Sequence, residues 1–478
     1  MSLVVQKYGG TSLGDAGKIS RAARRIAAEG RSVVVVVSAM GGTTDTMLGL
    51  AHNLTDDPHG RELDLLLSTG EQASAAALAI ALRELGVPAR SFSGRDGGII
   101  TDGVHGSARI VDVDPAQVLE CVRAGLVPVV TGFQGVAADS GELTTLCRGG
   151  SDTTAVALAA ALRAEVCEIF TDVEGVFTAD PRHVAEARKV DHLSYADMAE
   201  LAAHGAAVLA HPSVEYARAH GVRVHVRSSA TGASGTWVTE AHPAGPPDDD
   251  RFSALGIAHL TGQLRCRLDG VDPDALTSVT AALSDPALPV DVLDHPAGDV
   301  PVAGSLRFTT CADDRAQVDA VLAGLRAAGA FTGFRWSGPV GKVSLVGRGF
   351  RTHHPLVLDA LRTRRVAVRD TAVRARRISV TCAEHDVLDA VSHLHRAFLA
   401  PRSPRPPGPA REVASRDTAL PQQDSGGVEQ RRGHGHVGTS ARSTPPGPSP
   451  GAAPPPRSTP IASSSGRTRS VSNLITCC

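Results

Sequence analysis

The chain has 478 residues, of which 42% are hydrophobic and 21% charged, and its formal net charge is −2. This length can bury more than one core, and the nearly balanced charge excludes a strongly basic, nucleic-acid-binding class and indicates no membrane partner. We find no signal-peptide pattern and no apolar run near the length of a bilayer span, so a cytoplasmic location is expected. Eight cysteines without CxxC spacing predict neither a zinc site nor a disulfide framework.

The N-terminal segment SLVVQKYGGTSLGD predicts a buried strand at residues 3–5, followed by Lys7, Gly9 and Gly10, and then a helix over residues 18–28. A lysine at the end of a strand beside paired glycines is suited to meet phosphate. The alternative is a solvated surface lysine. The chain contains only four lysines among 48 Lys and Arg residues, which favours a site that needs a compact cation.

Val-rich strands, such as residues 33–37 and 127–130, alternate with Ala-rich helices up to about residue 230. This alternation is typical of an α/β fold in which a mainly parallel sheet is covered by helices on both faces.

Two later segments predict ligand-binding loops, TTLCRGGSDTTA at residues 144–155 and TDVEGVFTADPR at residues 171–182. Arg148 offers a planar fork for a carboxylate, and we expect Ser151 and Asp152 to cap the Ala-rich helix that follows. An anion fits the N-terminus of that helix. An ordinary glycine turn with a good N-cap is the alternative for the GGSD sequence alone.

These segments occur in one order with three further motifs, SAMGGTTD (38–45), STGEQ (68–72) and GFQG (132–135). The set resembles the aspartate kinases. That resemblance implies a three-layer amino acid kinase fold, followed by α+β ferredoxin-like ACT-type modules. It also implies transfer of the ATP γ-phosphoryl group to the side chain of L-aspartate, giving 4-phospho-L-aspartate. This reaction would open a route to lysine, threonine and methionine, or to a specialised metabolite.

The resemblance implies site residues in three groups and a nucleotide accompanied by Mg²⁺, with no metal site of the protein's own. Phosphoryl transfer to an ionised carboxylate needs positioning and cations more than a general base. Glu71 is suited to the substrate ammonium, although a carboxylate favouring the start of the helix QASAAALAIALREL is an equal alternative. The catalytic residues would be Lys7 and Asp152; the aspartate pocket Thr44, Glu71, Phe133, Arg148 and Ser151; and the nucleotide contacts Lys7, Gly9, Gly10, Ser38, Thr171, Asp172, Phe177 and Arg182.

One departure from the family bears on activity. The family has a phosphate-binding lysine in the segment GAAVLAHPSVEYAR, where this chain has Ala207. His204, His211 or Arg218 are candidates to replace it. Two alternative functions therefore stay open: a non-catalytic or weakly active paralogue that binds aspartate or partner subunits, and a kinase of another small amino acid.

We divide the chain into a kinase domain (1–230), a linker (231–252), a diverged pair of ACT-like modules (253–400) and a tail (401–478). The family's effector signatures are missing from GVDPDALTSV and VDVLDHP, so weak or absent inhibition by lysine or threonine is expected, with homo-oligomers forming through the ACT-like region. The arginine run between residues 358 and 377 is interpreted as a solvated face. The tail holds 14 of 30 prolines and no aromatic residue, which predicts disorder.

Overall fold

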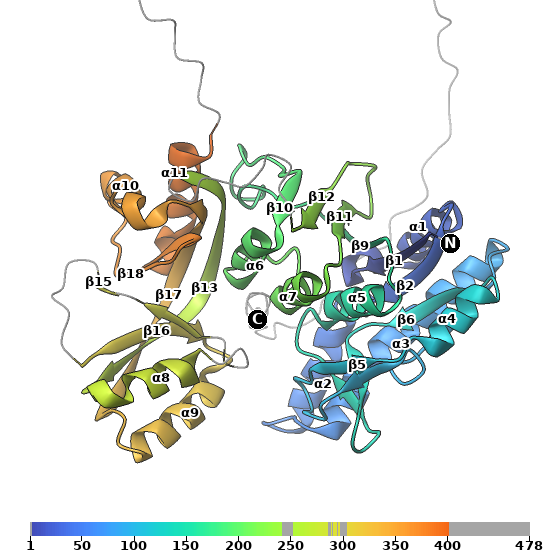
Figure 1. Cartoon of the computed structure of the whole chain (residues 1–478), viewed down its shortest axis with the longest axis horizontal. Coiled ribbons are helices and arrows are strands. Elements are labelled where there is room, and N and C mark those ends of the chain that lie inside the picture. Colours follow the sequence, from blue (N-terminus) through green and yellow to red (C-terminus); the bar gives the residue numbers. More distant parts are fainter. Residues whose placement is uncertain are drawn as a thin grey trace, which may run out of the picture. The chain divides into compact units, whose positions relative to one another are not determined.

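The computed structural model describes residues 2–240, 252–284, 288, 290–293, 295–296 and 304–400. The predicted tail from residue 401 onward lies outside these residues. Three sheets and their covering helices make up the described part of the chain (Figure 1).

The largest sheet is the mainly parallel one that the valine runs predict. Six of the seven strand pairings in this sheet are parallel, and only β11 and β12 pair antiparallel. β-Branched residues buried on both faces favour such strands. The strands follow the order β10 (His192–Ser194), β12 (Thr236–Thr239), β11 (Val224–Ser228), β9 (Val166–Thr171), β1 (Leu3–Tyr8), β2 (Ser32–Val37), β6 (Val127–Thr131) and β3 (Ala89–Phe92).

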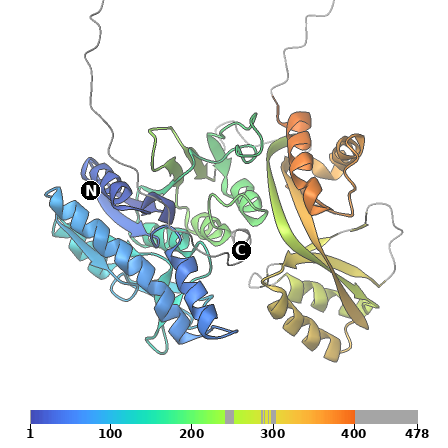
Figure 2. The same cartoon turned by 180° about the vertical axis from the view of Figure 1, so that it is seen from behind.

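Helices cover both faces of this sheet, as Figures 1 and 2 show. Alternate residues of β1 and β2 enter two separate apolar cores, one on each face. The helices of the first face are α1 (Ala16–Ala27) and α3 (Arg61–Glu84); those of the second are α4 (Ala116–Arg123), α5 (Gly150–Ala161), α6 (Tyr195–Ala203) and α7 (His211–His220). The structure therefore confirms the predicted layered α/β fold.

Helix α3 corrects one expectation from the sequence. By length and composition alone it could cross a bilayer, although no such run was expected. Half of its apolar window is buried in the protein, and it carries Asp64 and Glu71 into the interior. A core helix passes the same test, so α3 is weak evidence for a membrane.

A separate four-stranded sheet packs against α3 and α5. Its strands are β5 (Ile110–Val113), β4 (Ile99–Thr101), β7 (Gln134–Ala137) and β8 (Leu143–Thr145). The buried carboxylate of Asp64 accepts hydrogen bonds from Thr145 Oγ1 at 2.5 Å and from the Gly106 amide at 3.0 Å, and it pairs with His105 at 2.7 Å. Asp64 therefore fixes this sheet and its preceding loop to α3.

The third sheet is antiparallel and belongs to the region after residue 252. Its strands follow the order β14 (Val290–Leu293), β16 (Leu306–Cys311), β13 (Ser253–Asp269), β17 (Gly333–Arg348), β19 (Arg377–Cys382), β18 (Asp370–Val373) and β15 (His295–Pro296). One core packs against α8 (Leu276–Leu283) and α9 (Arg315–Ala327), and a second against α10 (Phe350–Thr363) and α11 (Val387–Phe398). Two packed cores fit the expected pair of α+β ACT-like modules. Short helices and α2 complete the described elements: η1 (Gly10–Ser12), α2 (Thr43–Leu54), η2 (Pro273–Ala275) and η3 (Glu384–Asp386).

Acidic residues of α6 form ion pairs with arginines of the antiparallel sheet. Asp197, which is 1% exposed, pairs with Arg376 at 2.9 Å and with Arg348 at 3.3 Å. Arg377 pairs with Glu200 at 3.0 Å. The interpretation of the whole arginine run as a solvated face is therefore wrong at its C-terminal end, because Arg376 and Arg377 have carboxylate partners on α6.

Arg377 also links the ion pairs of α6 to a buried charged cluster in the antiparallel sheet. The Asp291 carboxylate forms ion pairs with Arg377 Nη2 at 2.6 Å and with Nζ of the buried Lys342 at 2.6 Å. Burial alone would raise the pKa of Asp291, but Lys342 and Arg377 hold it well below its ordinary value. The cluster is thus a charged core in which each carboxylate has a cationic partner.

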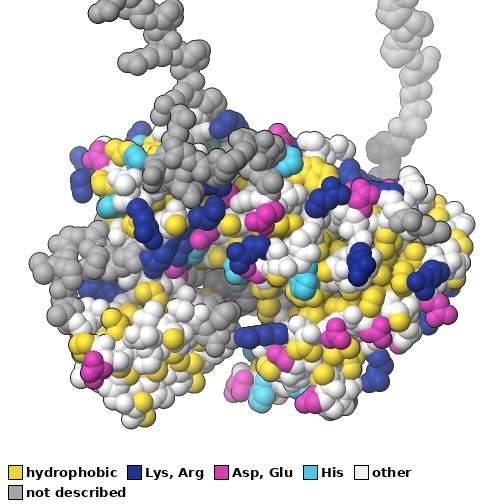
Figure 3. Space-filling view, viewed as in Figure 1, with side chains coloured by type: hydrophobic (Ala, Val, Ile, Leu, Met, Phe, Trp, Pro, Cys, Tyr) yellow, Lys and Arg dark blue, Asp and Glu magenta, His cyan; other side chains and the backbone are white. Residues whose placement is uncertain are grey.

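On the face shown in Figure 3, basic side chains of the described residues lie among acidic ones. This face therefore offers no continuous basic surface of the kind that nucleic-acid binding requires.

We expect Asp197→Ala to lower the free energy of unfolding by about 2–3 kcal/mol, because two arginines lose their partner. Removing one partner of a fully buried ion pair costs ~3–5 kcal/mol of stability. The loss expected here is smaller because the Arg376 side chain is about a third exposed. Urea unfolding measures the change. The control is Glu215→Ala, which removes an exposed pair with Arg218 and should change stability by about 0.5 kcal/mol or less. Equal effects of the two substitutions would contradict the importance of the α6 contact.

Candidate active site

Two glycine-containing turns meet at the carboxyl edge of the main sheet, where β1 and β2 end. The Ser38 amide donates to the Tyr8 carbonyl at 3.1 Å, and the Gly41 amide donates to the Gly10 carbonyl at 3.0 Å. A Cβ at Gly10 would lie 2.5 Å from the Ala39 carbonyl oxygen. Only glycine permits this approach, so the two turns form one compact platform.

The glycine pair does not offer all the donors that the sequence suggested. The Gly9 amide donates to the Phe170 carbonyl of β9 at 3.1 Å, so it is already occupied. A Cβ at Gly9 would stand 3.6 Å from Lys7 Nζ. This is an ordinary contact distance, so the space beside Lys7 does not require glycine, and the Gly9 amide serves the fold by bonding to β9.

Lys7 and Asp152 form the central ion pair of the site. Lys7 Nζ lies 2.6 Å from Asp152 Oδ1, and both side chains are about nine-tenths buried. Asp152 Oδ2 also accepts the Ala210 amide at 3.3 Å. The pair joins the central strand β1 to the first turn of α5, and the turn before α7 supports it.

The predicted cap of α5 is wrong. Helix α5 begins at Gly150, and its N-cap is Gly149 in the left-handed region, with φ 78° and no side-chain cap. A Cβ at Gly149 would lie 2.4 Å from the Ala210 side chain, so glycine is required there twice over. Ser151 and Asp152 lie inside the first turn. This placement leaves the Asp152 carboxylate available to Lys7.

Phe133 and Ser151 lie together beside this helix start. Phe133 has φ 66°, which is uncommon for a residue with a side chain and typical of functional sites. A Cβ added at Gly150 would lie 3.2 Å from the Phe133 ring. A Cβ added at Gly132 would lie 2.6 Å from the Cβ of the buried Ser151, which is a clash. The strained turn at Phe133 is therefore packed directly onto α5.

Glu71 projects into the platform from the middle of α3. Since α3 begins at Arg61, the alternative of a carboxylate near a helix start is wrong. Oε1 accepts the Ala39 amide at 2.9 Å, and Oε2 has no hydrogen-bond partner among the described residues. Burial raises the pKa of Glu71 to about 7, against the opposing effects of the Ala39 amide and Lys7. An unpartnered buried carboxylate oxygen suits a cationic ligand.

Arg148 lies near the start of α2, the helix that carries Thr44. Arg148 Nη1 is 3.6 Å from Asp45, the neighbour of Thr44 on α2, and the arginine side chain is 47% exposed. A contact of this length is loose, so the guanidinium can take a carboxylate ligand. Burial raises the pKa of the adjacent Cys147 thiol, which favours its packing role over reactivity.

The nucleotide loop after β9 is ordered by its own contacts. Thr171 Oγ1 donates to Asp172 at 3.1 Å, and the Ser229 amide donates to the Thr171 carbonyl at 2.8 Å. The backbones of Phe177 and Lys189 form an isolated antiparallel β-bridge. Arg182 is 82% exposed and binds Asp180 of the same loop through two nitrogens, so the structure does not bring Arg182 to the Lys7–Asp152 pair.

Two of the candidates to replace a lysine at Ala207 already have other roles. Burial lowers the pKa of His204 to about 4, and its ring faces Glu200 at 3.5 Å inside the α6 contact. Arg218 pairs with Glu215 at 2.9 Å on the surface of α7. His211 is the first residue of α7. Neither His204 nor Arg218 therefore supplies a free cation to the site.

The sequence and the fold of this chain are similar to those of characterised proteins. The family model described as Amino acid kinase family matches residues 2–228. The aspartokinase of Mycobacterium tuberculosis is 43% identical over 83% of this chain and 96% of its own, and that of Corynebacterium glutamicum is 42% identical over the same shares. The crystal structure of Escherichia coli aspartokinase III in complex with aspartate and ADP has a TM-score of 0.71 and 25% identity, covering 83% of this chain and 99% of its own.

The raised pKa of Glu71 gives a pH dependence of stability. The native state holds this proton more tightly than the unfolded chain, so the stabilising contribution is present below pH 4.5 and is lost as pH rises through about 7. Relative to Glu71→Gln, the wild type should therefore lose about 2–4 kcal/mol of unfolding free energy between pH 4.5 and 7.5. Urea unfolding at both pH values measures this change.

The matched control for this titration is Glu62→Gln, an exposed carboxyl in the first turn of the same helix. Its difference from the wild type should stay constant over the same range. A constant difference for Glu71→Gln as well would mean that Glu71 ionises as an ordinary surface carboxyl.

Proposed function

The chain belongs to the aspartokinases of the amino acid kinase family, and we propose that it transfers the ATP γ-phosphoryl group to the side chain of L-aspartate at the Lys7–Asp152 site. The observation that carries the proposal is the buried Lys7–Asp152 pair beside the unpartnered Glu71 Oε2. One cation for phosphate and one anion for an ammonium thus lie at the same edge of the sheet.

In the proposed reaction, an oxygen of the aspartate β-carboxylate attacks the γ-phosphorus. The new O–P bond forms as the bond between that phosphorus and the β–γ bridging oxygen breaks, and ADP leaves with the electron pair. The carboxylate is already ionised, so the protein needs no general base. Its contribution is to position the two substrates and to stabilise negative charge on the transferring group.

Lys7 is proposed to stabilise that charge, with Asp152 holding it in place. A lysine alone at the end of a strand has four rotatable bonds, whereas the 2.6 Å contact to Asp152 restricts it to one position. The Ala210 amide in turn fixes the carboxylate. Asp152 is therefore a positioning residue for Lys7 in this proposal.

The aspartate pocket is proposed to recognise both ends of an amino acid. Glu71 Oε2 would accept the α-ammonium, and Arg148 would bind the α-carboxylate with its planar fork. Thr44, Phe133 and Ser151 would line the space between them. A simple diacid lacks the ammonium and would leave Glu71 unpaired, so the pocket would select an amino acid.

ATP is proposed to lie across the ends of β1 and β9, against Ser38, Gly10, Thr171 and Asp172, with Phe177 and Arg182 beyond them. No three His, Cys, Asp or Glu residues of the described chain lie close enough to hold a metal ion. Mg²⁺ is proposed to enter with the nucleotide, bound mainly through phosphates and water, as nucleotide-bound Mg²⁺ commonly is. The ion would shield charge on the phosphates when it is bound.

The purified chain with ATP, Mg²⁺ and L-aspartate tests the reaction, with hydroxylamine trapping the acyl phosphate as a hydroxamate. We expect a hydroxamate that depends on both substrates and is lost in Asp152→Asn. Binding of both substrates without hydroxamate would favour the weakly active or non-catalytic alternative, for which the lack of a free cation at His204 and Arg218 is the specific observation. Hydroxamate with another amino acid only would replace aspartate as the substrate.

We also propose a cytoplasmic homo-oligomer that associates through the ACT-like region and serves amino-acid biosynthesis. The support is the packed pair of C-terminal modules, the type of region through which the resemblance implies association. Light scattering of the intact chain and of its 1–240 fragment would compare their masses.

Arg148→Ala should raise the Kd for L-aspartate about 30-fold and leave the Kd for ATP within about twofold. Truncating a buried charge partner costs about 2–5 kcal/mol, and the half exposure of Arg148 places the expected loss at the lower limit. Isothermal titration measures both constants. Arg123→Ala, an exposed arginine at the end of α4, is the control and should change neither. An unchanged Kd for aspartate in Arg148→Ala would show that the pocket lies elsewhere.

A further inference from the structure

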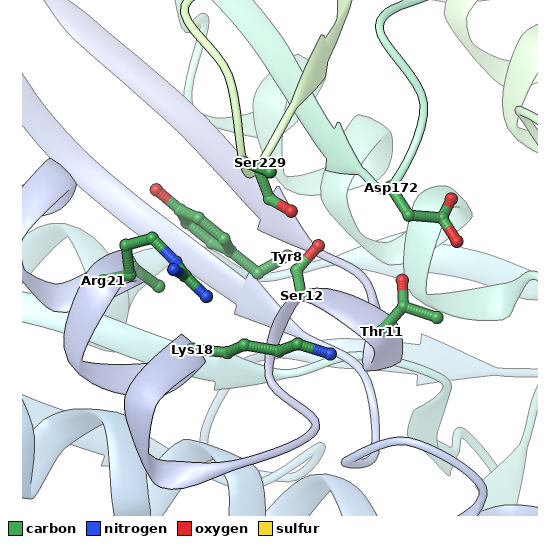
Figure 4. A pocket seen from close by; sticks show the side chains of 9 residues that line it. Tyr8, Thr11, Ser12, Lys18, Arg21, Asp172 and Ser229 are labelled. Atoms are coloured by element: carbon green, nitrogen blue, oxygen red, sulfur yellow. The ribbon is translucent and has the colours of Figure 1, made fainter.

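A cavity of about 290 Å³ lies on the α1 face of the main sheet, next to the Gly10–Ser12 turn (Figure 4). Tyr8 forms part of its wall, whereas Lys7, the preceding residue, points to the α5 face and Asp152. Successive side chains of a strand alternate in direction. Strand β1 therefore lies between the cavity and the Lys7–Asp152 pair.

Ser12 contributes an unsatisfied hydroxyl to this cavity. The residue is 5% exposed, and its Oγ has no hydrogen-bond partner among the described residues. Figure 4 shows this oxygen pointing into the cavity, toward Ser229. A buried hydroxyl without a partner costs free energy, so the arrangement favours a ligand that accepts or donates there.

Lys18 and Arg21 supply positive charge to the same cavity. They lie three residues apart on α1, which places them on one face of the helix. Lys18 Nζ lies over the turn, 3.7 Å from where a Cβ of Gly14 would be, and its nearest carboxylate is Asp15 at 3.8 Å. Figure 4 shows the Arg21 guanidinium on the side of the cavity that faces Ser12 and Lys18.

The other cations of this edge are already engaged. Lys7 pairs with Asp152 at 2.6 Å and Arg182 with Asp180 at 2.7 Å. Arg25, one turn beyond Arg21, donates to the carbonyls of Ser228 and Ser229 and so ties α1 to the opposite wall. Within the described chain, Arg21 has no carboxylate at ion-pair distance. Lys18 and Arg21 are thus the cations that a ligand can recruit here.

Asp172 is the one carboxylate that lines the cavity, and Asp15 lies nearby at the start of α1. Asp15 caps α1 by accepting the Lys18 amide at 2.8 Å, and Asp172 accepts Thr171 Oγ1. In Figure 4 the Asp172 carboxylate points away from Ser12 and Arg21. The polar lining other than Asp172 therefore consists of hydroxyl groups and two cationic groups, those of Lys18 and Arg21.

We propose that this cavity is a second anion subsite, which binds a phosphate group through Lys18, Arg21 and the hydroxyls of Ser12 and Ser229. A tetrahedral oxyanion has enough acceptor oxygens to satisfy both cations and the Ser12 hydroxyl at once, whereas a water molecule would satisfy only the hydroxyl. The phosphate can come from the tail of a nucleotide that extends over the Gly10–Ser12 turn or from a free phosphate anion. The subsite does not depend on the proposed phosphorylation of aspartate.

Titration of the intact chain with inorganic phosphate and, separately, with ATP tests the subsite by calorimetry. The test variant is Lys18→Met combined with Arg21→Gln, and Ser12→Ala is a second, uncharged change. Arg24→Gln is the matched control, because Arg24 is an exposed arginine of the same helix that does not line the cavity. Melting temperatures establish that each variant is folded, which is expected for Lys18 and Arg21 because both side chains reach solvent.

We expect the double variant to weaken phosphate binding at least about tenfold and Ser12→Ala about threefold, with Arg24→Gln unchanged. If phosphate competes with ATP and the double variant also weakens ATP, the nucleotide tail occupies the subsite; if ATP binding is unchanged, a free anion does. Both results support the subsite.

Unaltered phosphate and ATP binding in the folded double variant, or an equal loss in Arg24→Gln, would overturn the proposal. The assay reads binding and not turnover, so its failure is distinct from a negative hydroxamate test.

Discussion

The 2.6 Å contact between Lys7 and Asp152 is the interaction around which the site is arranged. It requires the end of β1 and the first turn of α5 to approach closely, and the structure meets that requirement with glycine. A Cβ at Gly132 would lie 2.6 Å from Ser151 of α5, and a Cβ at Gly149 would lie 2.4 Å from Ala210. A cation and an anion this close and this buried are each satisfied by the other, so the pair can persist away from water where isolated charges could not.

The valine runs and motifs of the first 230 residues predicted the layered fold, because the segments that begin KYGGTS, SAMGG, GFQG and TDVEG each lie at the end of a strand of the main sheet, namely β1, β2, β6 and β9. Local geometry was less accessible. The sequence GGSD suggests a Ser or Asp cap, but the tight contact between Gly149 and Ala210 decides where α5 begins. For Glu71 the alternative of a position near a helix start stayed open, because nothing in the sequence marks Arg61 as the beginning of a helix of 24 residues.

Partners distant in sequence account for the remaining differences. Arg376 and Arg377 stand in a basic run that is locally typical of a solvated surface, and only the third dimension brings Asp197 and Glu200 to them. Ser12 and Lys18 carried no signal of a cavity, because their neighbours Ser229 and Asp172 are more than 150 residues away. Asp64 is similar, since its hydrogen bonds reach His105 and Thr145. The pattern of apolar residues in a sequence predicts which residues are buried, but it does not predict which polar residues distant in sequence will pair.

Helix α6 packs on both the main sheet and the antiparallel sheet, and this affects where the chain can be joined to a relative in a chimera. Its apolar residues belong to the core of the main sheet, while Asp197 and Glu200 hold arginines of the antiparallel sheet, and its C-terminus leads directly to the turn whose Ala210 amide steadies Asp152. A chimera joined at the linker near residue 240 would separate these acids from their arginines. A hybrid that exchanges the C-terminal half together with residues 195–203 would keep the matched charges, so the natural crossover point for swapping regulatory halves lies before α6 and not in the linker.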